Sequence, residues 1–145
     1  MEKTFVMIKP DAVQRGIIGQ VITRFENKGM ILRNMKMIHI DNALAEKLYD
    51  IHKGKPFFEK LVSYITSAPV VVTVWEGPDA IKVVRKLVGA TKSNEAEPGT
   101  IRGDFGLTVD CNVIHASDAV ERAKYEMDLF FENPIDWKKI SEPWI

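Results

Sequence analysis

The chain has 145 residues, of which 46% are apolar and 28% charged, a composition typical of a globular protein and not of a disordered one. Lysine and arginine together number 20, as do aspartate and glutamate, so the net charge is zero and neither a nucleic-acid coat nor a polybasic membrane binder is favoured. The single cysteine, Cys111, excludes an intrachain disulfide and a zinc site built from cysteines. We find no signal peptide and no apolar run near the roughly 20 residues of a membrane span, so we expect a cytoplasmic protein with no membrane partner.

The first half of the chain alternates between strand and helix patterns. Residues 4–8 form a short apolar run that predicts a buried strand. A helix that ends at Gly29 is predicted next, because four apolar residues recur at helical spacing: Ile18, Val21, Ile22 and Phe25. Residues 30–40 favour a long strand. Residues 44–51 and 56–65 favour two short helices, the second with a proline in its first turn.

The second half contains the clearest strand and a long segment without period. Residues 69–75 carry five β-branched side chains and predict a strand. A helical stripe that ends at Gly89 follows, made of Ala80, Val83, Val84, Leu87 and Val88. Residues 90–105 show no pattern and predict a loop of about sixteen residues, a length that is usually functional in a compact domain. Residues 111–115 are short and β-like.

The last predicted helix begins near Asp118. Asp118 and Glu121 are spaced as an N-cap and its reciprocal partner, ahead of apolar positions expected to face inward: Val120, Ala123, Met127 and Phe130. Residues 131–145 have no period. We find no linker and no repeat, so we expect one domain over residues 1–145, and the pattern alone indicates either an α/β or an α+β fold.

The absence of the standard catalytic and nucleotide-binding motifs argues against several classes of enzyme. The chain lacks a Walker A loop, a dinucleotide-binding glycine motif, a serine-hydrolase elbow and an HExxH zinc motif. Residues 16–19 and 103–106 match the GxxG of RNA-binding KH domains. Matches of four residues are common by chance, and the net charge is zero, so we expect no specific nucleic-acid partner.

The three histidines are the candidate nucleophiles. His39 in a predicted strand and His52 at a predicted helix end favour structural or surface roles. His115 lies between a short strand and a predicted helix start, where free backbone N–H groups favour an anion. A neutral imidazole is a nucleophile near pH 7. From spacing alone, a catalytic and a structural role for His115 both stay open.

Three cations scattered along the chain could surround a phosphate group bound near His115. They are Lys9 after the first strand, Arg85 on the polar side of its helix and Arg102 in the long loop. A pair of opposite charges 4 Å apart is worth about 4 kcal/mol at an effective dielectric of 20, so convergence would matter greatly. The alternative is that each is a solvated surface charge, and spacing does not decide between the two.

Five segments carry a family resemblance. In order they are IKPDAVQRG (8–16), KPFF (55–58), SAPVV (67–71), PGTIRGDF (98–105) and NVIHASD (112–118). With these segments in this order and spacing, the chain resembles a nucleoside diphosphate kinase from end to end. The resemblance implies an α+β fold, namely a ferredoxin-like βαββαβ core with a four-stranded antiparallel sheet flanked by helices, a long active-site loop and an irregular C-terminal tail.

The resemblance also implies the reaction and the residues that perform it. His115 would accept the γ-phosphoryl group of a nucleoside triphosphate such as ATP and pass it to a nucleoside diphosphate, in a ping-pong mechanism. Two residues match positions that contact the sugar hydroxyls, Lys9 and Asn112, and Phe57 matches the ring that stacks on the base. Three residues match phosphate-binding positions: Arg85, Thr91 and Arg102. Three more match positions that support the histidine or the phosphates: Tyr49, Ser117 and Glu126.

Cofactor and partner follow from the same resemblance. Mg²⁺ would arrive with the nucleotide phosphates, so we expect no metal site built by the protein itself. Family members form tetramers or hexamers, so we expect a homo-oligomer. Two positions depart from the family: Ala116 stands where many relatives have glycine, and residues 91–93 read Thr-Lys-Ser where Thr-Asn-Pro is common. Alanine would matter only if that glycine uses angles closed to other residues, and loss of the proline should loosen the loop.

Two further functions are weighed against the kinase. A nucleotide-binding module without turnover is disfavoured by the intact His115. A phosphocarrier that receives phosphate from another protein would not need Phe57, Asn112 and the long loop arranged for a nucleotide. The three hypotheses differ in what the pure protein does with ATP and a second diphosphate.

Overall fold

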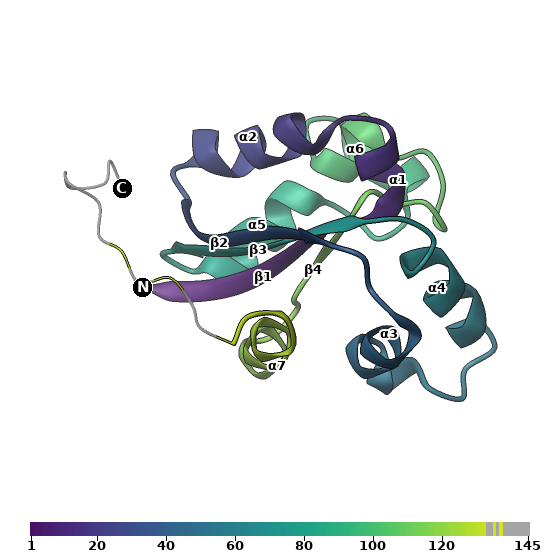
Figure 1. Ribbon diagram of the computed structural model, residues 1–145. Helices are drawn as coiled ribbons and strands as arrows, with labels where there is room; N and C mark the ends of the chain where they lie inside the picture. The colour runs from purple at the N-terminus through teal and green to yellow at the C-terminus, as the bar shows by residue number, and fades with distance from the viewer. Residues whose placement is uncertain (133–134, 136, 138–145) are drawn as a thin grey trace.

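A four-stranded antiparallel sheet forms the middle layer of the computed structural model, which describes residues 1–132, 135 and 137 (Figure 1). The strands lie in the order β2-β3-β1-β4 and comprise β1 (Glu2–Ile8), β2 (Ile31–Ile38), β3 (Val70–Gly77) and β4 (Ile114–Ala116). The helices that cover the sheet or lie at its ends are α1 (Pro10–Gln14), α2 (Ile18–Lys28), α3 (Asn42–Leu48), α4 (Phe58–Ile65), α5 (Ala80–Val88), α6 (Ile101–Phe105) and α7 (Val120–Phe130). Short 3-10 helices span η1 (Asp50–His52) and η2 (Ser93–Glu95).

This topology confirms the predicted ferredoxin-like α+β fold. Its βαββαβ core consists of β1, α2, β2, β3, α5 and β4, and every neighbouring pair of strands is antiparallel. The segment that joins β2 to β3 is expanded into α3, η1 and α4. We call residues 42–65, which contain these three helices, the 42–65 arm, and it projects beside the carboxyl end of β1 (Figure 1).

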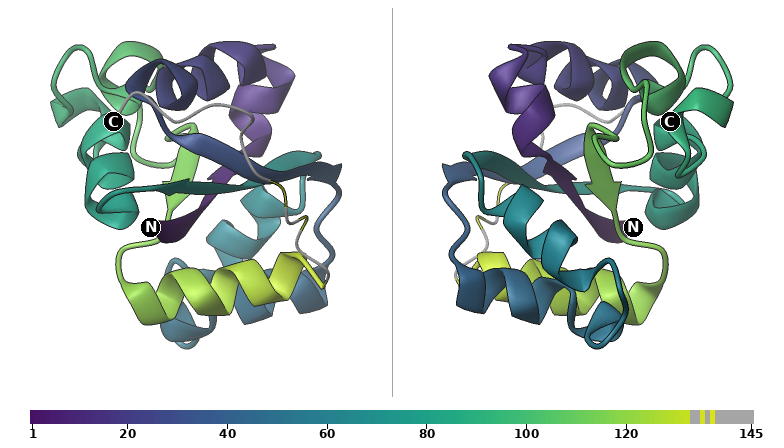
Figure 2. Two further views of the ribbon diagram at one scale, coloured as in Figure 1. Left: turned by 90° about the vertical axis from the view of Figure 1, so that its left-hand side faces the viewer. Right: turned by 90° about the vertical axis from the view of Figure 1, so that its right-hand side faces the viewer.

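Alternation along the central strand divides the core into two layers. Val6 and Ile8 pack with residues of α2 and α5, whereas Phe5 and Met7 pack with residues of α3 and α7. Figure 2 shows α2 on one face of the sheet and α3 and α7 on the other. Both faces of β1 are therefore buried, which explains why its sequence is a continuous apolar run instead of a polar and apolar alternation. β4 pairs with β1 over only three residues, with His115 opposite Met7. The imidazole consequently lies on the same face of the sheet as α7.

Glycine ends both long helices of the first layer, as the sequence predicts. Gly29 after α2 has φ 101° and Gly89 after α5 has φ 89°, angles that favour glycine. Three details of the prediction are wrong. The proline at 56 lies two residues before α4 and not in its first turn, residues 90–105 contain η2 and α6, and the short strand begins at 114.

The start of α7 also differs from the prediction. The N-cap is Ala119, and no side chain accepts a hydrogen bond from the backbone N–H groups of the first turn. Asp118 therefore does not cap this helix, and the predicted capping box is wrong. The observed cap thus lies one residue later than the spacing predicts, and Val120, which the sequence predicts to face inward, is 61% exposed. Ala123 and Phe130 are buried as expected, and Met127 packs partly against the second layer.

The described part of the tail runs along β2 of its own chain. The ring of Phe131 lies 5.0 Å from Lys36 Nζ, and the ring of Trp137 lies 4.8 Å from the guanidinium of Arg33. The N–H of Ile135 donates to Asn34 Oδ1 at 3.3 Å. The other large apolar residues of the predicted tail lie outside the described residues: Ile140, Trp144 and Ile145.

Candidate active site

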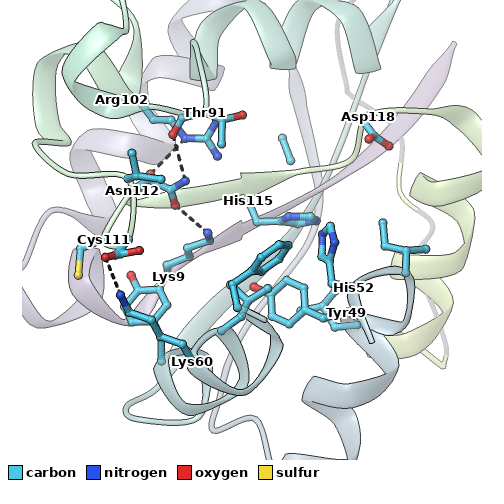
Figure 3. A pocket seen from close by; sticks show the side chains of 18 of the residues that line it. Lys9, Tyr49, His52, Lys60, Thr91, Arg102, Cys111, Asn112, His115 and Asp118 are labelled. Atoms are coloured by element: carbon cyan, nitrogen blue, oxygen red, sulfur yellow. Dashed lines mark hydrogen bonds and ion pairs between the residues drawn. The ribbon is translucent and has the colours of Figure 1, made fainter. Parts of the chain in front are cut away.

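A cavity of about 730 Å³ opens between the 42–65 arm and the segment that leads into β4 (Figure 3). That volume lies within the range of small-molecule sites. Every candidate residue from the sequence lines it except Ser117: Lys9, Tyr49, Phe57, Arg85, Thr91, Arg102, Asn112, His115 and Glu126. Ser117 lies immediately behind the wall, where its hydroxyl donates to Glu126 Oε1 at 2.7 Å. The structure therefore brings together candidate residues from α5, α6, β4 and α7 and from the loops between elements.

His115 lies in the middle of β4, not at a helix start. The first turn of α7 begins five residues later, so the expected contribution of free helix N–H groups at this histidine is wrong. The backbone of His115 is instead held in place by the pairing of β4 with β1. Its side chain is 23% exposed, and the labelled ring in Figure 3 points into the cavity.

Glu126 on α7 orients the imidazole. His115 Nε2 and Glu126 Oε1 are 2.7 Å apart, and Glu126 is 1% exposed. Burial raises the pKa of Glu126, but the net direction is downward because His115, Ser117 and Arg122 stabilise the carboxylate. An ionised carboxylate only accepts hydrogen bonds, so Nε2 carries the proton and Nδ1 keeps a free lone pair. The tautomer assigned from this contact leaves Nδ1 with the lone pair that a nucleophile needs.

Three cations lie on the wall of the same cavity, an arrangement that sequence spacing left open. Lys9 and Arg102 are buried and Arg85 is half-buried. Burial, and then the charge of Arg102, lowers the pKa of Lys9 to about 8. Burial, and then the charge of Arg85, lowers the pKa of Arg102 to about 10. The three charges destabilise one another, and an anion among them would relieve this repulsion.

The arginines also brace the backbone around His115. Arg102 donates through Nη2 to Ile114 O at 2.7 Å and through Nε to Asn112 O at 3.2 Å. Arg85 Nη1 donates to Ala116 O at 3.1 Å. A guanidinium has five N–H donors, so each arginine keeps donors for a ligand while it holds β4 in place.

Lys9 and Asn112 form a polar pair on the cavity wall (Figure 3). Lys9 Nζ donates to Asn112 Oδ1 at 2.7 Å, and Asn112 Nδ2 donates to Thr91 O at 3.3 Å. The pair joins residues 103 positions apart in sequence, which is why spacing alone does not reveal it.

A strained turn positions Asn112 and His115 on either side of Val113. Val113 has φ 73°, and Ile114 N–H donates to Asn112 O at 2.8 Å, which makes this a γ-turn. Such a backbone costs about 1–3 kcal/mol in a β-branched residue. Asp11 compensates, because its Oδ2 accepts the Val113 N–H at 3.1 Å and its Oδ1 accepts the Tyr64 hydroxyl. The roles of Asp11 and Tyr64 cannot be recognised in the sequence, because only the fold brings these residues to the turn.

Aromatic and apolar side chains line the outer part of the cavity. Phe57 is 47% exposed, and its ring lies 5.3 Å from the ring of His52. Val109 is 46% exposed on the opposite segment. Burial, and then Lys55, lowers the pKa of His52, so the neutral ring is favoured in this cluster. A flat aromatic surface at the mouth suits a planar ligand.

The two departures from the family pattern have structural outcomes. Within the described residues, Asp79 and Val113 are the non-glycine residues with positive φ, so Ala116 occupies ordinary strand backbone and needs no glycine. Ser93 is buried at the start of η2, and its hydroxyl has no partner among the residues described. Lys92 before it is extended, with φ −81° and ψ 103°, a conformation that also precedes proline.

The chain is similar to a large set of known proteins. The family model described as nucleoside diphosphate kinase matches residues 2–135. A nucleoside diphosphate kinase of Archaeoglobus fulgidus is 57% identical over all of this chain and 97% of its own length, and nucleoside diphosphate kinase 1 of Zea mays is 51% identical over all of this chain and 98% of its own. Among solved structures, a halophilic nucleoside diphosphate kinase from Halobacterium salinarum in complex with CDP superposes with a TM-score of 0.93 at 49% identity, covering 96% of this chain and 94% of that one.

Proposed function

The chain belongs to the nucleoside diphosphate kinase family, and on that basis we propose that it transfers the γ-phosphoryl group of a nucleoside triphosphate to a nucleoside diphosphate through His115. The observation that carries the assignment of the site is the convergence of Lys9, Arg85 and Arg102 on the cavity that His115 faces. The match over residues 2–135 supports treating residues 1–145 as one domain.

The proposed first half-reaction is an attack by Nδ1 of His115 on the γ-phosphorus of the triphosphate. A bond forms between nitrogen and phosphorus, the bond from the γ-phosphorus to the bridging oxygen breaks, and the nucleoside diphosphate leaves with that electron pair. Nε2 keeps its proton on the Glu126 side throughout, which supports the ring as positive charge develops on it. A second diphosphate then attacks the phosphohistidine in the reverse sense.

Charge stabilisation is the main task of the remaining residues. Phosphoryl transfer depends chiefly on positioning and on neutralising the equatorial oxygens of the transferring group. We assign this task to Arg85 and Arg102, with Thr91 as a further phosphate contact. Tyr49 can add a hydrogen bond, because its buried hydroxyl has no partner among the described residues and lies on the cavity wall.

We assign magnesium to the nucleotide and not to a protein cage. Mg²⁺ keeps several waters and binds in such sites through phosphate oxygens and one or two carboxylates. The lining residues fit that arrangement, because Asp118 contributes a carboxylate to the cavity wall. The other two carboxylates of the wall already have protein partners: Asp110 accepts from Lys60, and Glu126 is held by His115, Ser117 and Arg122. When bound, the ion would offset phosphate charge. The described residues contain no cluster of three potential metal-ligating side chains.

Turnover of several diphosphates tests the proposal and its specificity together. We assign base stacking to Phe57, which contributes about 1–3 kcal/mol per base without reading the base edge. We assign the sugar hydroxyl to Lys9 and Asn112, and a site built to pair a hydroxyl rejects analogues that lack it. With ATP as donor, we expect rates for GDP, CDP and dTDP within about one to two decades of one another, and far slower rates for 3′-deoxy diphosphates. Coupled detection of each triphosphate product measures this.

The same assay separates the competing functions. A nucleotide-binding module would bind ATP and form no second triphosphate. A phosphocarrier would need a protein donor and would ignore the added diphosphates. Strict selectivity for one base would contradict the proposed role of Phe57.

Assembly is also part of the proposal. We expect a homo-oligomer, a tetramer or a hexamer, at micromolar concentration. Met35 and Met37 are exposed on β2, an edge strand of the sheet, and such exposed apolar groups suit contact with a second copy. Sedimentation at about ten micromolar measures the species, and a single species near 16.5 kDa would contradict the expectation.

We retain a cytoplasmic location as a proposal. Over residues 1–132, 135 and 137, the structure contains no helix with the length and apolar character that a membrane crossing requires.

A further inference from the structure

Arg122 on α7 makes contacts that neither the proposed phosphoryl transfer nor the family resemblance uses. Its Nε donates to Glu126 Oε2 at 3.0 Å, and its Nη1 donates to Asp50 Oδ1 at 2.9 Å. Its Nη2 donates to Leu48 O. The guanidinium also lies 4.5 Å from the ring centroid of Tyr125, and its side chain is only 16% exposed. All three nitrogens are therefore engaged at fixed positions.

These contacts divide the carboxylate of Glu126 between two partners. Oε1 faces His115 and accepts from Ser117, whereas Oε2 accepts from Arg122. A carboxylate that receives a guanidinium on one oxygen cannot rotate without losing a charge-assisted hydrogen bond. The direction from which Glu126 approaches Nε2 of His115 is thus set from the side of Arg122.

The same guanidinium links α7 to the 42–65 arm. Leu48 ends α3 and Asp50 opens η1, and these residues flank Tyr49 on the cavity wall. Arg122 therefore connects this part of the cavity wall to Glu126, the residue that orients His115. Among the described residues, α7 and the arm are also joined by apolar packing and by the Tyr125 hydroxyl, which donates to Lys47 O at 2.8 Å, but neither contact reaches the carboxylate of Glu126.

We infer that Arg122 is a positioning residue for phosphoryl transfer, which holds the Glu126 carboxylate against His115 and ties it to the arm that borders the cavity. This inference rests on the proposed role of His115. Arg122 lines the cavity, but it acts through Glu126 and not on the transferring group.

Arg122 also keeps Glu126 ionised. Burial raises the pKa of this carboxyl, and the Arg122 hydrogen bond is one of the contacts that oppose burial. Several titratable or charged groups face Glu126 from the surrounding segments: His115 on β4, Tyr49 and Asp50 after α3, and Arg122 and Tyr125 on α7. Removing the guanidinium therefore moves the pKa of Glu126 upward, so the acid limb of the phosphorylation rate moves to higher pH.

The test measures phosphorylation of His115 by labelled ATP in single turnovers, with binding of a non-hydrolysable ATP analogue measured separately. Partners that orient a catalytic group typically contribute about 10- to 100-fold. For Arg122→Met we expect a loss of that size in the phosphorylation rate, less than about a threefold change in analogue affinity, and the upward shift of the acid limb. Arg122→Lys keeps the positive charge but loses the planar guanidinium with its several donors, so its phosphorylation rate should lie between those of the unaltered protein and Arg122→Met.

Arg24→Met is the matched control. Arg24 on α2 also pairs with a carboxylate, Asp104 at 2.7 Å, donates to a carbonyl, Gly99 O at 3.0 Å, and lies over an aromatic ring, Phe105 at 5.0 Å. It lies outside the cavity, on the other face of the sheet, so its loss should leave the rate and the pH profile unchanged.

The outcomes separate this inference from the function on which it rests. If Arg122→Met is phosphorylated at the unaltered rate with an unaltered pH profile, the inference is overturned while the role of His115 stands. If His115→Ala is labelled, the proposed function itself fails. Should Arg122→Met melt below the assay temperature, Asp50→Asn loosens the guanidinium without removing it, and an unaltered rate and pH profile in that variant and in Arg122→Lys would equally overturn the inference.

Discussion

Replacing His115 by alanine is expected to abolish labelling of the protein by γ-labelled ATP and to lower turnover by about four orders of magnitude or more. The cations that we assign to the phosphates remain in this variant, but without Nδ1 no phosphohistidine forms, so neither half-reaction of the proposed mechanism can take place. The label on the unaltered protein should be acid-labile and base-stable, as a phosphohistidine is and a phosphoserine is not.

Two comparisons make this result specific. His39→Ala is the matched control, since His39 is exposed beyond β2 and its Nε2 contacts only Thr66 O, at 2.8 Å, among the described residues. That variant should label normally. Acid-stable label on Ser117, or loss of label in His52→Ala with retention in His115→Ala, would place the phosphoryl group elsewhere.

The strands and the long helices could be predicted because local pattern decides them. The apolar run of β1, the β-branched run of β3 and the stripe of α5 each reflect burial that a short window of sequence already displays. The ferredoxin-like arrangement itself came from family resemblance, since the order β2-β3-β1-β4 depends on pairs of residues that lie about 30 to 110 positions apart in the sequence.

The sequence and the family resemblance name candidates that line one cavity, but they do not show the contacts between those residues. The sequence names Lys9, His115 and Glu126, yet it does not show that Asp11 supports the strained Val113 turn. The spacing of Arg122 and Glu126, four apart on a helix, does indicate a pair, but such pairs are usually solvated and worth little. Here one partner is 1% exposed, a fact that only the fold supplies.

The start of α7 shows why the helix boundary was missed. The sequence contains an aspartate and a glutamate three residues apart, which is the capping-box spacing, but the chain leaves β4 in extended conformation through Ala119. Short-range capping therefore yields to the geometry by which α7 returns across the sheet to bring Glu126 to His115. The tertiary contact outweighs a cap worth about 1 kcal/mol.

Replacing Lys9 by methionine should lower kcat/KM by about 30- to 4,000-fold. The lysine is 7% exposed and Asn112 is 5% exposed, and truncating one member of a buried charged hydrogen bond costs about 2–5 kcal/mol.

The pH dependence of kcat/KM tests whether the positive charge of Lys9 is what matters. Because the pKa of Lys9 lies at about 8, the free enzyme loses this cation above that pH, and kcat/KM should fall by up to about tenfold per pH unit on the alkaline side. The Lys9→Met profile should lack this limb. Lys82→Met, an exposed change on α5, should keep both the rate and the limb.

The stability of the nucleotide-free protein should respond to the same lysine in the opposite direction. The pKa of Lys9 lies at about 8 when folded and at the ordinary 10.5 when unfolded, so between these values the unfolded state binds more protons. The contribution of Lys9 to the free energy of unfolding therefore rises with pH across this window, because below it the folded protein holds a buried charge that has no anion beside it. Urea unfolding of the unaltered protein and of Lys9→Met, compared at pH 7.5 and about pH 10, measures the difference. If the difference in the free energy of unfolding between the two proteins stays constant with pH, burial does not lower the pKa of Lys9. If the difference moves in favour of the unaltered protein while its kcat/KM falls, the charge on Lys9 destabilises the free fold and serves the binding of the nucleotide.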